Sequence, residues 1–177
     1  DVKAAWRVLL DRTAGREHPR EMTRLAFGIS MGGAAVQLAA PSLSGLDGVI
    51  VDSTFADISV VAQKQAAASG FPGPLSYFAL AIARLAVRPV AAAPVLSVRP
   101  VDAVRAGGAW PAAVLHSRRD PMIPFSEAEA LVEAYAGRAT LTDFDVPHHP
   151  NAHLAAPARY DAAVSALAER AERRAKR

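Results

Sequence analysis

The chain has 177 residues, of which 51% are hydrophobic and 21% are charged, and these proportions are typical of one globular domain. Its formal net charge of +3 arises within residues 169–177, so the rest of the chain is neutral. This distribution lacks the positive field that nucleic-acid binding requires, and we expect residues 169–177 to form the solvated basic end of a helix. The absence of cysteine excludes disulfides, thiolate metal sites and a cysteine nucleophile, and it favours the cytoplasm.

The first part of the chain alternates between helical and extended patterns. Residues 2–13 place apolar side chains on one helical face. An apolar run at 24–29 then predicts a strand, and the small apolar residues after Gly33 predict a helix. Residues 48–53 contain a continuous β-branched run without alternation, which is typical of a central parallel strand covered on both faces.

The middle of the chain is predicted to be mainly helical. Two helices are expected over residues 57–69 and 74–87, separated by a breaker rich in Gly and Pro. Several prolines then impose an irregular passage, and residues 111–117 form the next candidate strand. No apolar run reaches the roughly 18 residues of a membrane-spanning helix.

The last part of the chain completes the alternation of helices and strands. A helix over 126–135 is predicted to begin with a capping box formed by Ser126 and Glu129. Residues 140–146 alternate between apolar and polar, as in an edge strand, and a final helix begins at Pro157. Four strands alternating with helices predict an α/β fold with a parallel sheet and right-handed crossovers.

The segment Gly28-Ile29-Ser30-Met31-Gly32 lies between a predicted strand and a predicted helix. This G-x-S-x-G pattern is typical of a nucleophile elbow, a sharp turn that exposes the hydroxyl of Ser30. We expect glycine at positions 28 and 32 because a Cβ at either would collide across the turn. The turn would place Ser30 at a helix N-terminus, where the backbone N–H of Met31 can donate to an oxyanion.

A serine hydroxyl is a weak nucleophile on its own and needs a base and a carboxylate. In this architecture the three residues follow the order Ser, Asp or Glu, His. Asp120 follows the strand predicted at 111–117, at the carboxyl end where open α/β sheets build their sites. Asp52, at the end of the preceding strand, is the alternative acid, but the chain order favours Asp120.

Three histidines follow the last predicted strand, namely His148, His149 and His153. The base must reach Ser30 with one ring nitrogen and the acid with the other. We predict His153, because its short connection to the helix at Pro157 would hold it over the sheet. His149 is the alternative.

Four segments together resemble the α/β-hydrolase superfamily, and more narrowly its prolyl-oligopeptidase-like and serine-aminopeptidase-like branch. They are GISMGGAAVQLAA, GVIVDSTFAD, HSRRDPMIPFSEAEALVEAY and VPHHPNAHLAAPARYDAAV, and the resemblance covers nearly the whole chain. By this resemblance Ser30, Asp120 and His153 carry over as nucleophile, acid and base. Two details depart from the family pattern: Ser117 replaces the usual glycine after the strand-end histidine, and the base lacks the usual glycine-rich approach.

The family fold has eight strands, and the four predicted here correspond to its second half. The first half normally supplies the neighbour of the elbow strand and a loop with the second oxyanion donor, and no such H-G-G-G-type segment occurs in the chain. The chain also begins at Asp1 rather than Met. Without neighbours the elbow strand would be an apolar edge that pairs with another chain. We therefore expect the natural protein to be longer, or this chain to pair with another polypeptide.

The resemblance implies a single catalytic region over 1–177 with a small helical cap at 55–100. The apolar side chains of this cap either line an acyl pocket or pack its helices on the sheet, and both interpretations stay open. The expected function is a serine hydrolase that cleaves a carboxylic ester or related acyl bond in a small-molecule substrate. A peptidase of the same fold and a non-catalytic hydrolase-like module are the alternatives. We expect no metal, cofactor, nucleic-acid partner or membrane segment.

Overall fold

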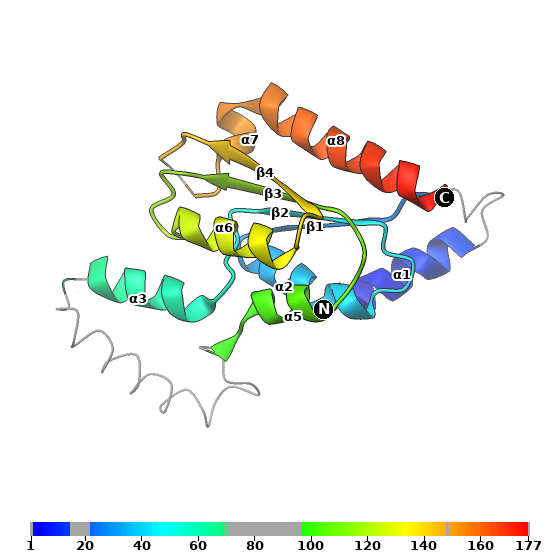
Figure 1. The fold of residues 1–177 in the computed structure, drawn as a ribbon, viewed down its shortest axis with the longest axis horizontal. Coiled ribbons are helices and arrows are strands. Elements are labelled where there is room, and N and C mark those ends of the chain that lie inside the picture. The colour runs from blue at the N-terminus through cyan, green and yellow to red at the C-terminus, as the bar shows by residue number, and fades with distance from the viewer. Residues whose placement is uncertain (1, 15–21, 69, 71–96, 148, 177) are drawn as a thin grey trace.

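A sheet of four parallel strands, in the order β1-β2-β3-β4, forms the centre of the chain (Figure 1). The strands are β1 (Leu25–Ile29), β2 (Gly48–Asp52), β3 (Ala112–Ser117) and β4 (Ala139–Phe144). This computed structural model describes residues 2–14, 22–68, 70, 97–147 and 149–176. The predicted α/β fold with a parallel sheet is confirmed, and all four strands lie where the sequence pattern indicated.

Helices cover both faces of the sheet (Figure 1). One face is covered by α2 (Met31–Ala39), α5 (Pro100–Ala106) and α6 (Phe125–Ala134), and α1 (Val2–Ala14) packs on α2. The other face is covered by α8 (Pro157–Ala175). The remaining helical segments are the short turn η1 (Ala40–Ser42), α3 (Ile58–Ala68) and α7 (Ala152–Ala155).

The two central strands have no exposed residue, because helices lie against both of their faces. Every residue of β2 and β3 is buried, as the uninterrupted apolar run in β2 predicted. One apolar cluster joins the sheet to α2, α5 and α6, and a second joins it to α8 through Tyr160 and Leu167. The burial of both faces fixes the register, so the carboxyl ends of all four strands meet at one edge.

The strand that leads to Ser30 is less covered than its neighbours. Among the described residues, β1 pairs only with β2. Phe27 and Ile29, on one face of β1, are 48% and 36% exposed. β1 is therefore an edge strand with exposed apolar side chains, as expected. That it pairs with another part of the protein or with a second polypeptide stays a prediction.

The start of α6 differs from the predicted capping box. The helix begins at Phe125, and no side chain caps it because Pro124 occupies the N-cap position. Ser126 thus lies inside the first turn, where its side chain cannot accept the hydrogen bond of a capping residue. The prediction of a Ser126–Glu129 capping box was wrong.

The first turn of α6 instead uses Glu127, a residue that the sequence pattern did not single out. Its carboxylate is buried and accepts the backbone N–H groups of Ala56 and Asp57 at 2.9 and 2.8 Å. Burial raises the pKa of Glu127, although the two hydrogen bonds favour its charged form. This contact ties α6 to the turn that follows β2.

The predicted cap is described only in part. Its first predicted helix corresponds to α3, and α5 begins at its last residue, Pro100, where we expected an irregular passage. The second predicted helix, at 74–87, lies outside the described residues. The basic end of the chain is helical as far as Ala175.

Candidate active site

Ser30 lies in a sharp turn between β1 and α2. Its backbone has φ 52° and ψ −122°, a left-handed conformation that is uncommon for residues other than glycine. The Ser30 N–H donates to the carbonyl oxygen of Asp52 at 2.8 Å, and the Thr54 hydroxyl donates to the Ser30 carbonyl at 2.8 Å. These bonds to β2 and the residues after it hold Ser30 in this strained conformation.

The glycines around Ser30 differ in why they are needed. A Cβ on Gly28 would lie 2.4 Å from the carbonyl oxygen of Gly32, which is the collision that we expected. A Cβ on Gly32 would meet nothing within 4 Å, so the same expectation for Gly32 was wrong. The second close approach involves Gly33, whose Cβ would lie 2.8 Å from the Cβ of Thr54. The turn therefore needs Gly28 and Gly33 for steric reasons.

Met31 is the first residue of α2, so its backbone N–H has no acceptor within the helix. Among the described residues no hydrogen bond engages this N–H. The N-terminal end of a helix carries a partial positive charge, which favours a negative charge placed there. Met31 itself is 71% exposed.

Asp120 lies in the loop between β3 and α6, and its side chain is fully buried. One carboxylate oxygen, Oδ1, accepts the backbone N–H groups of Met122 and Ile123 at 2.8 and 2.9 Å. The second oxygen, Oδ2, lies 2.6 Å from Nδ1 of His149. The loop thus holds one oxygen with its own backbone and leaves the other to orient an imidazole.

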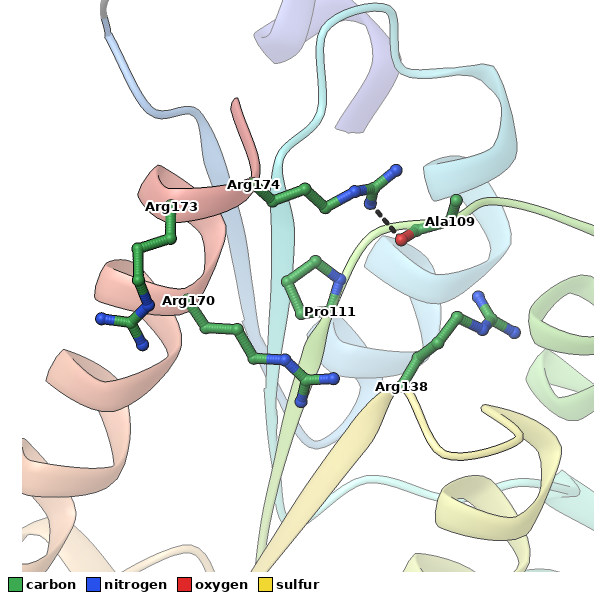
Figure 2. A pocket seen from close by; sticks show the side chains of 6 residues that line it. All are labelled: Ala109, Pro111, Arg138, Arg170, Arg173 and Arg174. Carbon is green, nitrogen blue, oxygen red and sulfur yellow. Dashed lines mark hydrogen bonds between the residues drawn. The ribbon is translucent and has the colours of Figure 1, made fainter. Parts of the chain in front are cut away.

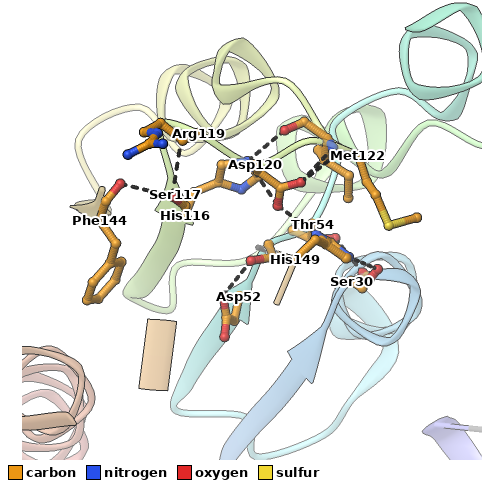
Figure 3. Close-up of polar contacts among 12 residues, drawn as sticks. Ser30, Asp52, Thr54, His116, Ser117, Arg119, Asp120, Met122, Phe144 and His149 are labelled. Carbon is orange, nitrogen blue, oxygen red and sulfur yellow. Dashed lines mark hydrogen bonds and ion pairs between the residues drawn. The ribbon is translucent and has the colours of Figure 1, made fainter. Parts of the chain in front are cut away.

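His149 bridges Asp120 and Ser30 (Figure 3). Its Nε2 lies 2.9 Å from Ser30 Oγ, opposite the 2.6 Å contact of Nδ1 with the carboxylate. A carboxylate only accepts hydrogen bonds, so Nδ1 carries a proton and, in the neutral ring, Nε2 accepts from the Ser30 hydroxyl. The His149 side chain is only 6% exposed, which shields both hydrogen bonds from water. The Ser30 hydroxyl, the His149 imidazole and the Asp120 carboxylate are therefore joined by two consecutive hydrogen bonds.

In the described part of the chain His153 makes no hydrogen bond to Ser30 or Asp120, so the prediction that it contacts both was wrong. The residues around His153 form the short helix α7 rather than the loop that we expected. Its ring is exposed and makes an edge contact with Tyr160, with ring centroids 5.9 Å apart. The alternative, His149, is the histidine that lies nearer the end of β4 and over the edge of the sheet.

The alternative acid, Asp52, lies in a separate hydrogen-bonded group. Its buried carboxylate accepts the hydroxyls of Ser53 and Tyr160 at 2.9 and 3.0 Å. Burial raises the pKa of Asp52, and these hydrogen bonds partly offset the rise. No hydrogen bond joins Asp52 to His149 in the described part of the chain, so the structure brings Asp120 and not Asp52 to the imidazole.

Ser117 connects the two loops that carry Asp120 and His149, a role that the sequence did not predict. Its hydroxyl oxygen lies 2.6 Å from the Val146 carbonyl oxygen and accepts the Val146 N–H at 2.9 Å. A glycine at this position would lack both contacts. The departure from the family pattern is therefore a cross-link between the end of β3 and the segment after β4.

His116, near the end of β3, contacts the loop that carries Asp120. Its ring is fully buried, and Nε2 lies 3.2 Å from the Ile123 carbonyl oxygen and 4.0 Å from Asp120 Oδ2. Burial lowers the pKa of His116, so the neutral ring donates its Nε2–H to this carbonyl. The loop that carries Asp120 is thus held by His116 as well as by its own backbone hydrogen bonds.

Helix α3 contacts the same loop from the opposite side. Lys64 Nζ donates to the Asp120 carbonyl oxygen at 2.9 Å, and Gln65 Nε2 donates to the Met122 carbonyl oxygen at 3.1 Å. Phe55, just before α3, packs with Ile123 in a small buried cluster. The described part of the predicted cap therefore lies against the site.

Comparison with known proteins shows the fold. An esterase of Pyrococcus furiosus matches 96% of this chain at 18% identity with a TM-score of 0.63. The esterase domain of a Rhodothermus marinus protein matches 98% at 20% identity with a TM-score of 0.59, and a monoacylglycerol lipase of Paleococcus ferrophilus matches 95% at 19% identity with a TM-score of 0.55. The chain has the α/β-hydrolase fold.

This chain spans only part of the solved α/β-hydrolase structures. It covers 60% of the Pyrococcus esterase, 67% of the Rhodothermus domain and 75% of the lipase. No family model matches the sequence, and no curated protein is similar to it in sequence. Within the described residues, every helix is too short or too polar to cross a bilayer, and no group of three or more His, Asp and Glu side chains could hold a metal ion.

Proposed function

We propose that this chain is the catalytic part of a serine hydrolase that cleaves carboxylic esters through an acyl-enzyme. The observation that carries the proposal is the position of His149, with Nδ1 2.6 Å from Asp120 and Nε2 2.9 Å from Ser30. These distances are those of a base in contact with its nucleophile and its orienting carboxylate. The strained backbone of Ser30 further supports the assignment.

The geometry suggests a specific sequence of proton transfers. His149 Nε2 takes the hydroxyl proton while Ser30 Oγ attacks the ester carbonyl, and Asp120 stabilises the resulting imidazolium. The imidazolium then gives the proton to the leaving alkoxide, which departs as an alcohol. Water hydrolyses the acyl-enzyme with His149 again as base, which regenerates Ser30.

The negative oxygen of the tetrahedral intermediate needs donors aimed at it. The Met31 N–H is suitably placed for this role, since it follows Ser30 at the positive end of α2. The α/β-hydrolase fold uses a second donor from a loop earlier in the fold. We propose that this donor comes from a part of the protein, or a partner chain, that also pairs with β1.

An ester with an apolar acyl group fits the surroundings of the site better than a charged substrate. Met31 is 71% exposed and Met122 is 46% exposed, and they follow Ser30 and Asp120 closely in the chain. Three of the solved structures described above are an esterase, an esterase domain and a lipase.

A peptidase is the second candidate. An acylaminoacyl peptidase of Pyrococcus horikoshii matches 84% of this chain at 13% identity, with a TM-score of 0.55 over 23% of its own length. The same Ser, His and Asp arrangement cleaves esters and amides. Substrate assays are needed to separate the two functions.

The test compares p-nitrophenyl acetate, p-nitrophenyl octanoate and an acyl-p-nitroanilide as substrates, with Ser30→Ala as control. We expect ester hydrolysis that depends on Ser30, with a higher kcat/KM for the octanoate because of the apolar surroundings. Equal efficiency on both esters would remove the support for an apolar acyl site. Amide cleavage as efficient as ester cleavage would favour the peptidase, and ester hydrolysis that persists in Ser30→Ala would contradict the proposal.

A further inference from the structure

A hollow of about 500 Å³ lies at the amino ends of the strands, opposite the ends that lead to Ser30. It is formed between the C-terminal part of α8 and the starts of β3 and β4. Figure 2 shows it from close by. The side chains that line it are those of Ala109, Pro111, Arg138, Arg170, Arg173 and Arg174. Four of these six are arginines and none is acidic. Arg173 is paired with Glu169, so three guanidinium groups without a carboxylate partner among the described residues make the hollow positive.

The basic groups at the end of α8 differ in their partners. Lys176, which does not line the hollow, lies 2.5 Å from Glu172, and the lining Arg173 lies 3.4 Å from Glu169. Arg170 is half-buried and has no acceptor in the part of the chain that the structure describes. Basic side chains at the C-terminal end of a helix can simply balance the helix dipole. That role does not require them to meet a basic side chain from a distant strand. Arg138, just before β4, makes that convergence a feature of the fold.

Two of the guanidinium groups are held in place by backbone carbonyls. Arg174 donates to the carbonyl oxygen of Ala109, and Arg138 donates to that of Gly108. Each guanidinium has five N–H donors in a rigid plane, so one hydrogen bond leaves others directed elsewhere. In Figure 2 the side chains of Arg170 and Arg174 reach from α8 toward Pro111. The guanidinium groups of Arg138 and Arg174 are thus positioned before any ligand binds.

We propose that this arginine hollow binds a small phosphorylated ligand with at least two negative charges, such as a diphosphate. Arginine matches the oxygens of phosphate with paired hydrogen bonds, and the three guanidinium groups of Arg138, Arg170 and Arg174 together favour a multiply charged anion. The volume of the hollow is in the range of small-molecule sites and exceeds that of a single inorganic ion.

This site is separate from the proposed catalytic centre. Ser30, Asp120 and His149 follow the carboxyl ends of β1, β3 and β4, whereas Pro111 and Arg138 precede β3 and β4. A strand of six residues separates the two ends by about 20 Å. The proposal therefore goes beyond ester hydrolysis, and its test does not depend on activity.

The test is a calorimetric titration of the protein with sodium pyrophosphate at constant ionic strength. Arg170→Gln removes a guanidinium that has no acceptor in the described part of the chain. The variant therefore loses no hydrogen bond there, and we expect it to fold as the wild type does. We expect it to weaken pyrophosphate binding by about 10- to 100-fold, the effect of losing hydrogen bonds to a charged group. Lys176→Gln removes the same charge from the same helix outside the hollow and should bind as the wild type does.

Three results would overturn the proposal. The first is no pyrophosphate binding by the wild type, and the second is equal weakening in Arg170→Gln and Lys176→Gln, which would indicate general charge attraction. The third concerns the source of the phosphate. Binding to vesicles that contain phosphatidic acid, without binding of free pyrophosphate, would indicate a membrane surface instead of a small ligand.

Discussion

Replacement of His149 by glutamine is expected to lower kcat/KM for ester hydrolysis by about 10²–10⁴-fold, the usual contribution of general acid–base catalysis. Glutamine can occupy the space between Asp120 and Ser30, but it cannot take the serine proton. The structure has this imidazole 2.9 Å from Ser30 Oγ and 2.6 Å from the carboxylate. The loss should appear mainly in kcat, because substrate binding does not require the proton transfer.

His153→Gln is the matched control for this prediction. The residue lies four positions along the same segment, and its exposed ring contacts Tyr160 rather than the site. We expect activity close to that of the wild type. Loss of activity in His153→Gln together with full activity in His149→Gln would mean that the loop rearranges and that the base is His153 after all.

Gly28→Ala is expected to destabilise the protein by more than the roughly 1–3 kcal/mol typical of an overpacked core. The added Cβ would lie 2.4 Å from the Gly32 carbonyl oxygen and 2.7 Å from the Cα of Gly33. These are backbone atoms at the start of α2, so no side-chain rotation can relieve the contact. We expect a lower free energy of unfolding in urea, or, in the extreme, a chain that does not fold.

Gly32→Ala tests whether the steric explanation is correct. It adds the same methyl group four residues away, where a Cβ meets nothing within 4 Å. Because Gly32 lies within α2 and alanine has the higher helix propensity, we expect stability to be unchanged or raised by up to about 1 kcal/mol. If both variants lost the same stability, the close approach at Gly28 would not be the reason for the glycine.

The layout of the fold could be predicted from the sequence because the sheet is buried on both faces. The run over β2 and the one over β3 are apolar without alternation, as strands buried on both faces require. Short elements were missed for a physical reason. α5 and α7 have seven and four residues, too few for a periodic pattern, and they are stabilised by packing rather than by propensity.

The site could be predicted only in part. The elbow pattern and the position after a strand identified Ser30 and Asp120, and the structure joins them through one histidine. Choosing between His149 and His153 required the direction of the chain after β4, which depends on α7 and on the Ser117–Val146 contact. Neither feature has a sequence pattern of its own. The requirement for glycine at position 33 likewise comes from contact with Thr54, a residue 21 positions away, and so could not be predicted from the local sequence.

The most direct test of the central claim is labelling with a fluorophosphonate probe, followed by mass spectrometry to locate the adduct. The probe reacts only with a serine whose hydroxyl is activated by its neighbours and whose oxyanion site is at least partly formed. We predict an adduct on Ser30 in the wild type, none in Ser30→Ala, and much slower labelling in His149→Gln. A folded protein, with any chain that pairs with β1 in place, that leaves Ser30 unlabelled would contradict the account.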